Sequence, residues 1–228
     1  MNYARARRML PQAVVRQAYH FERTIEEAVR EFSDALAAGS AVLDAGAGET
    51  QYKPFFARHR YVAVDLGVGD SGWDYTRIDV LADLTRLPFR DGVFDAAINI
   101  VTLEHLAEPG AALAEMARAM RRGAVALIVA PQEWEVHQAP HDYFRYTRYG
   151  LELLLRRAGL EPVEIAAIGG FWRLLSRRLL NAVQQSAWFM KPLSALALVP
   201  LALGAALLDP LDVRRDFTLG YRCLARKP

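Results

Sequence analysis

The most constraining feature of the sequence is a regular alternation of short apolar runs with amphipathic segments. Four apolar runs have the length of buried strands and occupy residues 41–45, 61–64, 94–100 and 124–130. Residues 109–120 begin with Pro and are followed by Gly123, which is typical of a helix between two strands. Strands that alternate with helices form mainly parallel sheets with helices on both faces. The sequence therefore predicts an α/β fold.

Further helices are predicted at residues 22–38 and 148–158, and further strands at 163–168 and 217–225. Residues 132–146, rich in aromatic residues and histidine, are too long for an ordinary connection and are a candidate functional loop. An insert of low charge follows at residues 169–216. Within its stretch 179–208 the only charged residue is Lys191.

Length and composition limit the classes of protein that the chain can belong to. Its 228 residues fit one domain, and a net charge of +2 argues against nucleic acid as the main partner. Cys223 is the only cysteine, which excludes an internal disulfide. The first ten residues carry Arg5, Arg7 and Arg8 but no apolar run behind them, so we expect no secretory signal and a cytoplasmic protein.

The most informative motif is Asp44-Ala-Gly46-Ala-Gly48, which follows a strand, together with Asp65 at the end of the next strand. Glycines let the backbone approach a ligand, and a carboxylate at the second strand end can accept hydrogen bonds from ribose hydroxyls. A dinucleotide-binding turn needs a third glycine where this chain has Gln51. The motif therefore predicts a nucleoside ligand without a pyrophosphate.

The chain resembles the class I S-adenosylmethionine-dependent methyltransferases over roughly residues 40–168, in blocks that occur in order. These blocks are Val42-Leu43-Asp44-Ala45-Gly46-Ala47-Gly48, Ala82-Asp83-Leu84, Leu87-Pro88-Phe89, Phe94-Asp95 and Leu103-Glu104-His105-Leu106. The resemblance implies a Rossmann-like methyltransferase fold, with a doubly wound, mainly parallel seven-stranded sheet and an antiparallel last strand. It predicts one domain with an N-terminal helical cap (1–39), a cofactor-binding core (40–168), the apolar insert (169–216) and the last strand (217–228).

The resemblance also implies that S-adenosyl-L-methionine is the cofactor. Gly46 and Gly48 would line its methionine part, and Asp44 would orient that turn. Asp65 would hold the ribose. The family often has a third glycine at the position of Thr50, so the shape of the turn is expected to differ in detail.

Three more residues are expected at the cofactor by the same resemblance. Asp83, with the backbone of Leu84, would meet the amino edge of the adenine. Asn99, at the end of the fourth strand, would lie near both cofactor and substrate.

A narrower resemblance lies in residues 139–147, which read Ala-Pro-His-Asp-Tyr-Phe-Arg-Tyr-Thr, and in the Gly-Leu pairs that follow. It is similar to a bacterial subgroup often found among genes for surface polysaccharide or glycoconjugate assembly. We therefore expect methylation of a small-molecule or glycoconjugate acceptor, on oxygen. The alternatives are N- or C-methylation of another metabolite, a non-catalytic cofactor-binding subunit, and a nicotinamide oxidoreductase, against which Gln51 argues.

The same loop supplies the candidate catalytic and substrate-binding residues. His141 or His137 could act as a general base toward an oxygen acceptor, although positioning alone could suffice. Tyr143 and Arg145 could bind a polar substrate. The alternative for His141 is a role in anchoring the loop, and the alternative for Arg145 is an ion pair with a nearby carboxylate.

No metal is expected from the sequence. His105 follows Glu104, and some quinone-pathway methyltransferases place a metal at a similar Glu-His pair. Those enzymes have a further Glu three residues earlier, where this chain has Val101. A packed or capping role for His105 is therefore favoured.

The insert is too short in its uncharged part for a membrane span, and Pro200 interrupts it. A buried cap or a homodimer face is the favoured interpretation. The alternative is peripheral contact of residues 171–208 with the inner face of a membrane. Arg173, Arg177 and Arg178 would then meet headgroups, and the aromatic residues would meet acyl chains.

Overall fold

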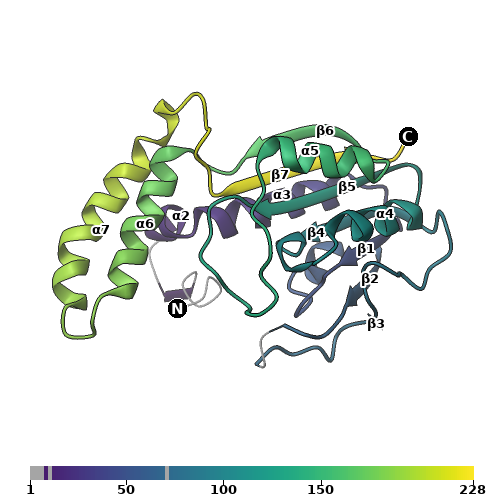
Figure 1. Cartoon of the computed structure of the whole chain (residues 1–228), viewed down its shortest axis with the longest axis horizontal. Helices are drawn as coiled ribbons and strands as arrows, with labels where there is room; N and C mark the ends of the chain where they lie inside the picture. The colour runs from purple at the N-terminus through teal and green to yellow at the C-terminus, as the bar shows by residue number, and fades with distance from the viewer. Residues whose placement is uncertain (1–7, 10–11, 70–71) are drawn as a thin grey trace. The chain divides into compact units, whose positions relative to one another are not determined.

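The computed structural model describes residues 8–9, 12–69 and 72–228. Arg5 and Arg7, which belong to the prediction about the N-terminus, lie outside the described residues. The chain folds into two compact units (Figure 1). One contains residues 25–166 and 221–228, and we call it the sheet unit. The other contains the described residues up to Thr24 together with Ala167–Gly220, and we call it the helical unit.

The sheet unit is built on seven strands in the order β3-β2-β1-β4-β5-β7-β6. The pairs β1–β2, β1–β4, β2–β3 and β4–β5 are parallel. The N–H of Gly123 donates to the carbonyl of Lys227, and the N–H of Lys227 donates to the carbonyl of Ala124, so β7 runs antiparallel to β5. The predicted fold class is confirmed. The strands are β1 Ala41–Ala45, β2 Arg60–Asp65, β3 Val80–Leu81, β4 Phe94–Ile100, β5 Met120–Pro131, β6 Glu161–Ala167 and β7 Gly220–Arg226.

The central strands carry the core, because β1 is buried at every position and β4 and most of β5 are also buried. Such continuous apolar runs are typical of strands covered on both faces. The helices and short turns of this unit are α3 His20–Ala35, which also enters the helical unit, η1 Lys53–Phe56, η2 Leu103–His105, α4 Pro109–Ala119 and α5 Arg148–Arg157. Pro109 begins α4, and the Thr147 side chain caps α5 by accepting from the N–H of Gly150 at 3.1 Å.

The predicted element bounds differ from the structure by a few residues. Helix α3 begins two residues earlier than predicted and ends at Ala35, three residues before the predicted end. Strand β5 begins four residues earlier than predicted. Strand β3 was not predicted, because its two residues are too few to produce a periodic pattern.

The helical unit contains α2 Gln12–Ala18, α6 Phe171–Gln185, α7 Lys191–Leu207 and η3 Asp209–Leu211. The carboxylate of Asp209 accepts from the N–H groups of Gly170 and Arg173, at 2.9 and 3.0 Å, and so caps the start of α6. Helix α7 packs against α6, with alanines among its buried residues and several leucines exposed. Among the described residues, no helix has both the length and the apolar character to cross a bilayer.

Candidate functional site

The turn at residues 46–48 lies at the carboxyl ends of the parallel strands, where ligands bind in open α/β sheets. The N–H groups of Gly46 and Ala47 both donate to the carbonyl of Val64, at 2.8 and 3.0 Å. Gly46 has a φ of +88°, and a side chain there would collide with Thr102. Glycine is therefore required at position 46 by the backbone conformation and by the close approach of a neighbouring side chain.

Asp65, the last residue of β2, holds this turn in place. One of its carboxylate oxygens accepts from the N–H of Gly48 at 2.9 Å, and the other accepts from the N–H of Gly67 at 2.8 Å. Asp65 is only partly buried, and each oxygen can accept a further hydrogen bond. The structure thus brings into direct contact two residues, Asp65 and Gly48, that were predicted as ligands of different parts of one cofactor.

Asp44 is buried near the end of β1, and its carboxylate accepts from the hydroxyl of Tyr61 on β2. Burial raises the pKa of Asp44 to about 7. The nearby charge of Asp65 also raises this pKa, and the hydrogen bond from Tyr61 lowers it. Tyr61 was missed in the sequence. Its only signal was a hydroxyl-bearing side chain on the strand expected beside β1.

The other predicted cofactor residues follow β3 or belong to β4. Asp83 is exposed, and its carboxylate accepts from the N–H and the hydroxyl of Thr85, both at 2.8 Å, while Leu84 is buried. The buried Asn99 donates to the carbonyl of Ala45 at 2.7 Å, but its Oδ1 has no hydrogen-bond partner. An unpartnered buried oxygen costs about 1–3 kcal/mol, which marks this end of β4 as a place for a polar ligand.

The backbone is strained directly after β4. Val101 has a φ of +53°, which is rare for a β-branched residue, and such strain clusters at ligand sites. The next residue, Thr102, donates its hydroxyl toward the carbonyls of Gly46 and Ile100, each at 3.2 Å. The strained corner is therefore tied to the glycine turn.

The connection from β2 to β3 also lies against the glycine turn. The ring of Trp73 lies so near Gly48 that a Cβ at that glycine would be 3.2 Å from it. The hydroxyl of Tyr75 accepts from the N–H of Gly69 at 2.7 Å, and the N–H of Asp74 donates to Glu49 at 3.2 Å. Trp73 was also missed, because an aromatic residue in an irregular connection has no periodic signal.

The loop at residues 132–147, which we call the acceptor loop, docks on η2. The N–H groups of Tyr143 and Phe144 donate to the carbonyl of Glu104, at 2.8 and 3.3 Å. The hydroxyl of Tyr146 donates to the carbonyl of Leu103 at 2.8 Å. These bonds fix one end of the loop beside the carboxyl end of β4.

An ion pair inside the acceptor loop uses Arg145. Its guanidinium donates to both carboxylate oxygens of Asp142, at 2.6 and 2.8 Å, and this pairing holds the pKa of Asp142 well below its usual value. It also donates to the carbonyls of Trp134, Glu135 and Phe144. The contact with Asp142 is the ion pair that was the alternative for Arg145, and substrate binding by Arg145 stays a prediction.

The two predicted bases occupy different surroundings. The Nδ1 atom of His141 is 3.0 Å from the hydroxyl of Tyr143, and the contact is open to solvent. His137 instead lies against η2, with Nδ1 3.0 Å from the carbonyl of Glu135 and its ring against His105. His105, predicted to be packed, has a side chain that is 11% exposed.

Comparison with known proteins agrees with this geometry. Residues 43–128, which include β2, β3 and β4, match the family described as "Methyltransferase domain". The chain carries a methyltransferase domain. The resemblance to the class I S-adenosylmethionine-dependent methyltransferases is therefore confirmed, for the part of the chain that contains the glycine turn, Asp65, Asp83 and Asn99.

One curated relative of this methyltransferase domain is a demethylmenaquinone methyltransferase from Mycobacterium marinum. It is 35% identical over 111 residues, which are 47% of this chain and 46% of that protein. The chain spans less than half the length of the curated relatives it matches.

Two solved structures share the fold of the methyltransferase domain over most of the chain. The [4+2]-cyclase SpnF has a TM-score of 0.59 at 21% identity and covers 90% of this chain and 81% of its own. A 1,6-didemethyltoxoflavin-N1-methyltransferase from Burkholderia thailandensis, with bound 1,6-didemethyltoxoflavin and S-adenosylhomocysteine, has a TM-score of 0.56 at 22% identity. It covers 94% of this chain and 88% of its own.

Proposed function

We propose that this chain transfers a methyl group from S-adenosylmethionine to an oxygen atom of a small-molecule or glycoconjugate acceptor. The observation that carries the proposal is the bond from the N–H of Gly48 to Asp65, at the carboxyl edge of the sheet, within the region that matches the methyltransferase domain. A glycine turn and a strand-end carboxylate in contact form a site for a nucleoside.

The residues at this edge fit the proposed cofactor. Neither Gly46 nor Gly48 carries a side chain, and Asp65 keeps acceptor capacity for ribose hydroxyls. The unpartnered Oδ1 of Asn99 offers a further acceptor. Asp83 and Leu84 remain our candidates for the adenine. When bound, the cofactor would supply a methyl group on a sulfonium sulfur, and that sulfur would leave as a neutral thioether when the acceptor atom bonds to the methyl carbon.

The contribution of the acceptor loop is to position the acceptor and to remove its proton. Methyl transfer gains most from holding two reactants in line, so a loop tied to η2 and stiffened by the Asp142–Arg145 pair suits this task. Of the two predicted bases, His141 is favoured, because its contact with Tyr143 is open to solvent whereas the ring of His137 packs against His105. Tyr143, which contacts His141, is the remaining candidate for substrate binding.

Two alternatives remain as proposals of lower rank. N- or C-methylation would use the same cofactor edge with a different acceptor. A non-catalytic cofactor-binding role would leave the acceptor loop without a reaction. The cyclase among the structural neighbours shows why the fold alone does not choose a reaction.

Calorimetric titration and a transfer assay test the proposal together. We expect the protein to bind S-adenosylmethionine and S-adenosylhomocysteine, and not a nicotinamide dinucleotide. Extracts of the source organism, incubated with the protein and the cofactor labelled in its methyl group, should then yield a labelled acceptor. Binding without any labelled product would favour the non-catalytic role, and dinucleotide binding alone would reject the proposal.

For the localisation, we propose a cytoplasmic protein that contacts a membrane surface through α6 and α7. The support is an apolar surface on α7 and on the connection that precedes it, where Trp188 is 83% and Leu196 is 76% exposed. Arg173 and Arg177 lie near Asp209 and Glu22 inside the helical unit, at 3.9 and 3.8 Å. Apolar insertion, more than attraction of these arginines to lipid headgroups, would therefore drive binding.

Co-sedimentation with liposomes tests this contact. We expect the protein to sediment with liposomes that contain anionic lipid, and a Trp188→Ser, Phe189→Ser variant to stay in solution. Leu153→Ser, which removes an exposed leucine from α5, is the matched control and should sediment like the wild type. If nothing sediments, and the double variant instead converts a dimer to a monomer, the surface belongs to a second copy of the chain.

A further inference from the structure

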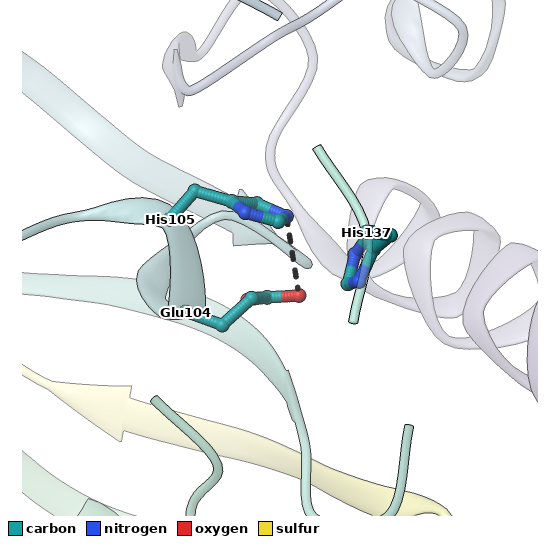
Figure 2. A group of neighbouring side chains, drawn as sticks. All are labelled: Glu104, His105 and His137. Atoms are coloured by element: carbon teal, nitrogen blue, oxygen red, sulfur yellow. Dashed lines mark ion pairs between the residues drawn. The ribbon is translucent and has the colours of Figure 1, made fainter. Parts of the chain in front are cut away.

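Three side chains with metal-binding atoms meet where the acceptor loop docks on η2. They are Glu104 and His105, from η2, and His137, from the loop, and one ligand atom of each lies within 4.8 Å of the others. Figure 2 shows the three side chains turned toward a common point. All three belong to the sheet unit, but His137 is far from the other two in sequence.

The carboxylate of Glu104 is the unusual member of this group. Its side chain is completely buried, and neither of its oxygens has a hydrogen-bond partner. Leaving a buried carboxyl group without partners costs several kcal/mol, so such a group requires an explanation. A bound cation is one partner that would satisfy both the charge and the lone pairs.

The two imidazoles are oriented as ligands. The Nδ1 atom of His105 lies 2.6 Å from the carbonyl of His141, so it carries the proton and donates, which leaves Nε2 with a free lone pair. That Nε2 is buried without a hydrogen-bond partner, 3.8 Å from Glu104. In His137, Nδ1 likewise lies 3.0 Å from the carbonyl of Glu135. Metal-binding histidines have this arrangement, with one nitrogen donating to a carbonyl and the other on the metal.

We propose that Glu104, His105 and His137 form a binding site for a divalent transition metal ion of the zinc type. Two imidazoles and one carboxylate are a ligand set used by zinc, and three protein ligands leave a position open for water or a substrate oxygen. The proposal does not depend on methyl transfer.

The distances require only a small adjustment. Two ligand atoms that each lie about 2.1 Å from one metal ion are at most about 4.2 Å apart. The 3.8 Å between Glu104 and His105 satisfies this limit, and the longest separation in the group, up to 4.8 Å, exceeds it by about half an ångström. The side chain of His137 is 25% exposed and lies in a loop, so a rotation of its ring can close the gap.

The positive charge beside the group is compensated. Arg145 is the nearby positive group, but its bidentate pair with Asp142 neutralises it. Burial raises the pKa of Glu104 to about 8 and lowers the pKa of His105, so without a cation both groups are neutral near pH 7. The competing interpretation is therefore a buried carboxylic acid beside two neutral imidazoles, which would bind no metal.

Titration of metal-depleted protein with Co²⁺ and with Zn²⁺ alone distinguishes the two. We expect one equivalent of metal per chain, and Co²⁺ absorption bands without a thiolate charge-transfer band, because the only cysteine, Cys223, is buried in β7 outside the group. Glu104→Gln and His137→Ala should each weaken binding by at least about a hundredfold, since the loss of supporting contacts alone costs 10–100-fold. His141→Ala is the matched control from the same loop and should bind like the wild type.

Circular dichroism of each variant reports whether it folds. If Glu104→Gln does not fold, His137→Ala still tests the proposal. Failure of the folded wild type to bind either metal would overturn the proposal. The same conclusion would follow if His141→Ala, but not His137→Ala, lost the metal, because the ion would then sit elsewhere on the loop. The proposed function is tested separately, by binding of S-adenosylhomocysteine, and neither of these two results would count against it.

Discussion

The glycine turn after β1 and the acceptor loop after β5 both follow the carboxyl ends of parallel strands, but they satisfy their polar groups in different ways. At the turn, the carboxylate of Asp65 binds backbone N–H groups, so the site is a rigid frame with acceptor capacity left for a ligand. In the loop, Asp142 and Arg145 bind each other, and the carboxylate of Glu104 beneath it has no hydrogen-bond partner. The comparison suggests that the turn holds the cofactor and that the loop carries the chemistry specific to the acceptor.

The largest expected effect separates the two regions by activity. If His141 is the base, His141→Ala should lower turnover by about 10²- to 10⁴-fold and leave cofactor affinity nearly unchanged. Tyr143→Phe removes only the hydroxyl beside Nδ1 of His141, so its effect should be about tenfold or less. Steady-state kinetics with the acceptor found in the extract assay measure both. Unchanged turnover in His141→Ala would assign the residue to loop anchoring.

A second prediction concerns the buried carboxyl group beside the turn. Asp44 has a pKa of about 7 in the folded protein, above its unfolded value near 4, so the folded state binds the proton more tightly. The contribution of Asp44 to stability is therefore present at low pH and is lost as the pH rises toward 7. Relative to Asp44→Asn, the wild type should lose about 2–3 kcal/mol of unfolding free energy between pH 5 and pH 8.

Urea denaturation of both proteins at the two pH values measures this difference. Groups that titrate in both proteins cancel from the comparison. A constant difference between pH 5 and pH 8 would mean that Asp44 is ionised throughout, and the hydrogen bond from Tyr61 would then dominate over burial.

A third prediction concerns the rigidity of the turn. Gly46→Ala adds a side chain at positive φ that collides with Thr102, whereas Gly123→Ala, at a φ of +78°, meets nothing within 4 Å. Both variants carry the backbone strain, so their difference isolates the collision, which should cost about 1–3 kcal/mol. Thermal unfolding and titration with S-adenosylhomocysteine should show weaker binding only in Gly46→Ala. Equal effects in both variants would mean that the turn can move away from Thr102.

The two regions also differ in how far the sequence predicted them. The turn was predictable, because Asp44, Gly46 and Gly48 lie within five residues and Asp65 ends the next strand of a parallel sheet. The partners that shape it were not, since Tyr61, Trp73 and Thr102 reach the turn from other elements. The structure shows where the predicted residues lie, while their roles toward cofactor and substrate stay predictions.

In the acceptor loop, residue types were predictable but their partners were not. His137, His141 and Arg145 were singled out, yet neither spacing nor periodicity could tell that His137 meets His105 or that Arg145 pairs with Asp142. Irregular loops acquire their geometry from long-range contacts, such as the hydrogen bonds to the carbonyl of Glu104. The expectation that no metal binds rested on Val101 alone and did not consider a ligand from so distant a segment.

The most direct test of the division between turn and loop is titration of S-adenosylhomocysteine into Asp65→Ala and His141→Ala side by side. Removing Asp65 deletes a charged acceptor, which should cost about 1.5–3 kcal/mol, or roughly ten- to a hundredfold in affinity. His141→Ala should bind like the wild type. If Asp65→Ala kept full affinity while His141→Ala lost it, the cofactor would be held by the loop and the account would be wrong.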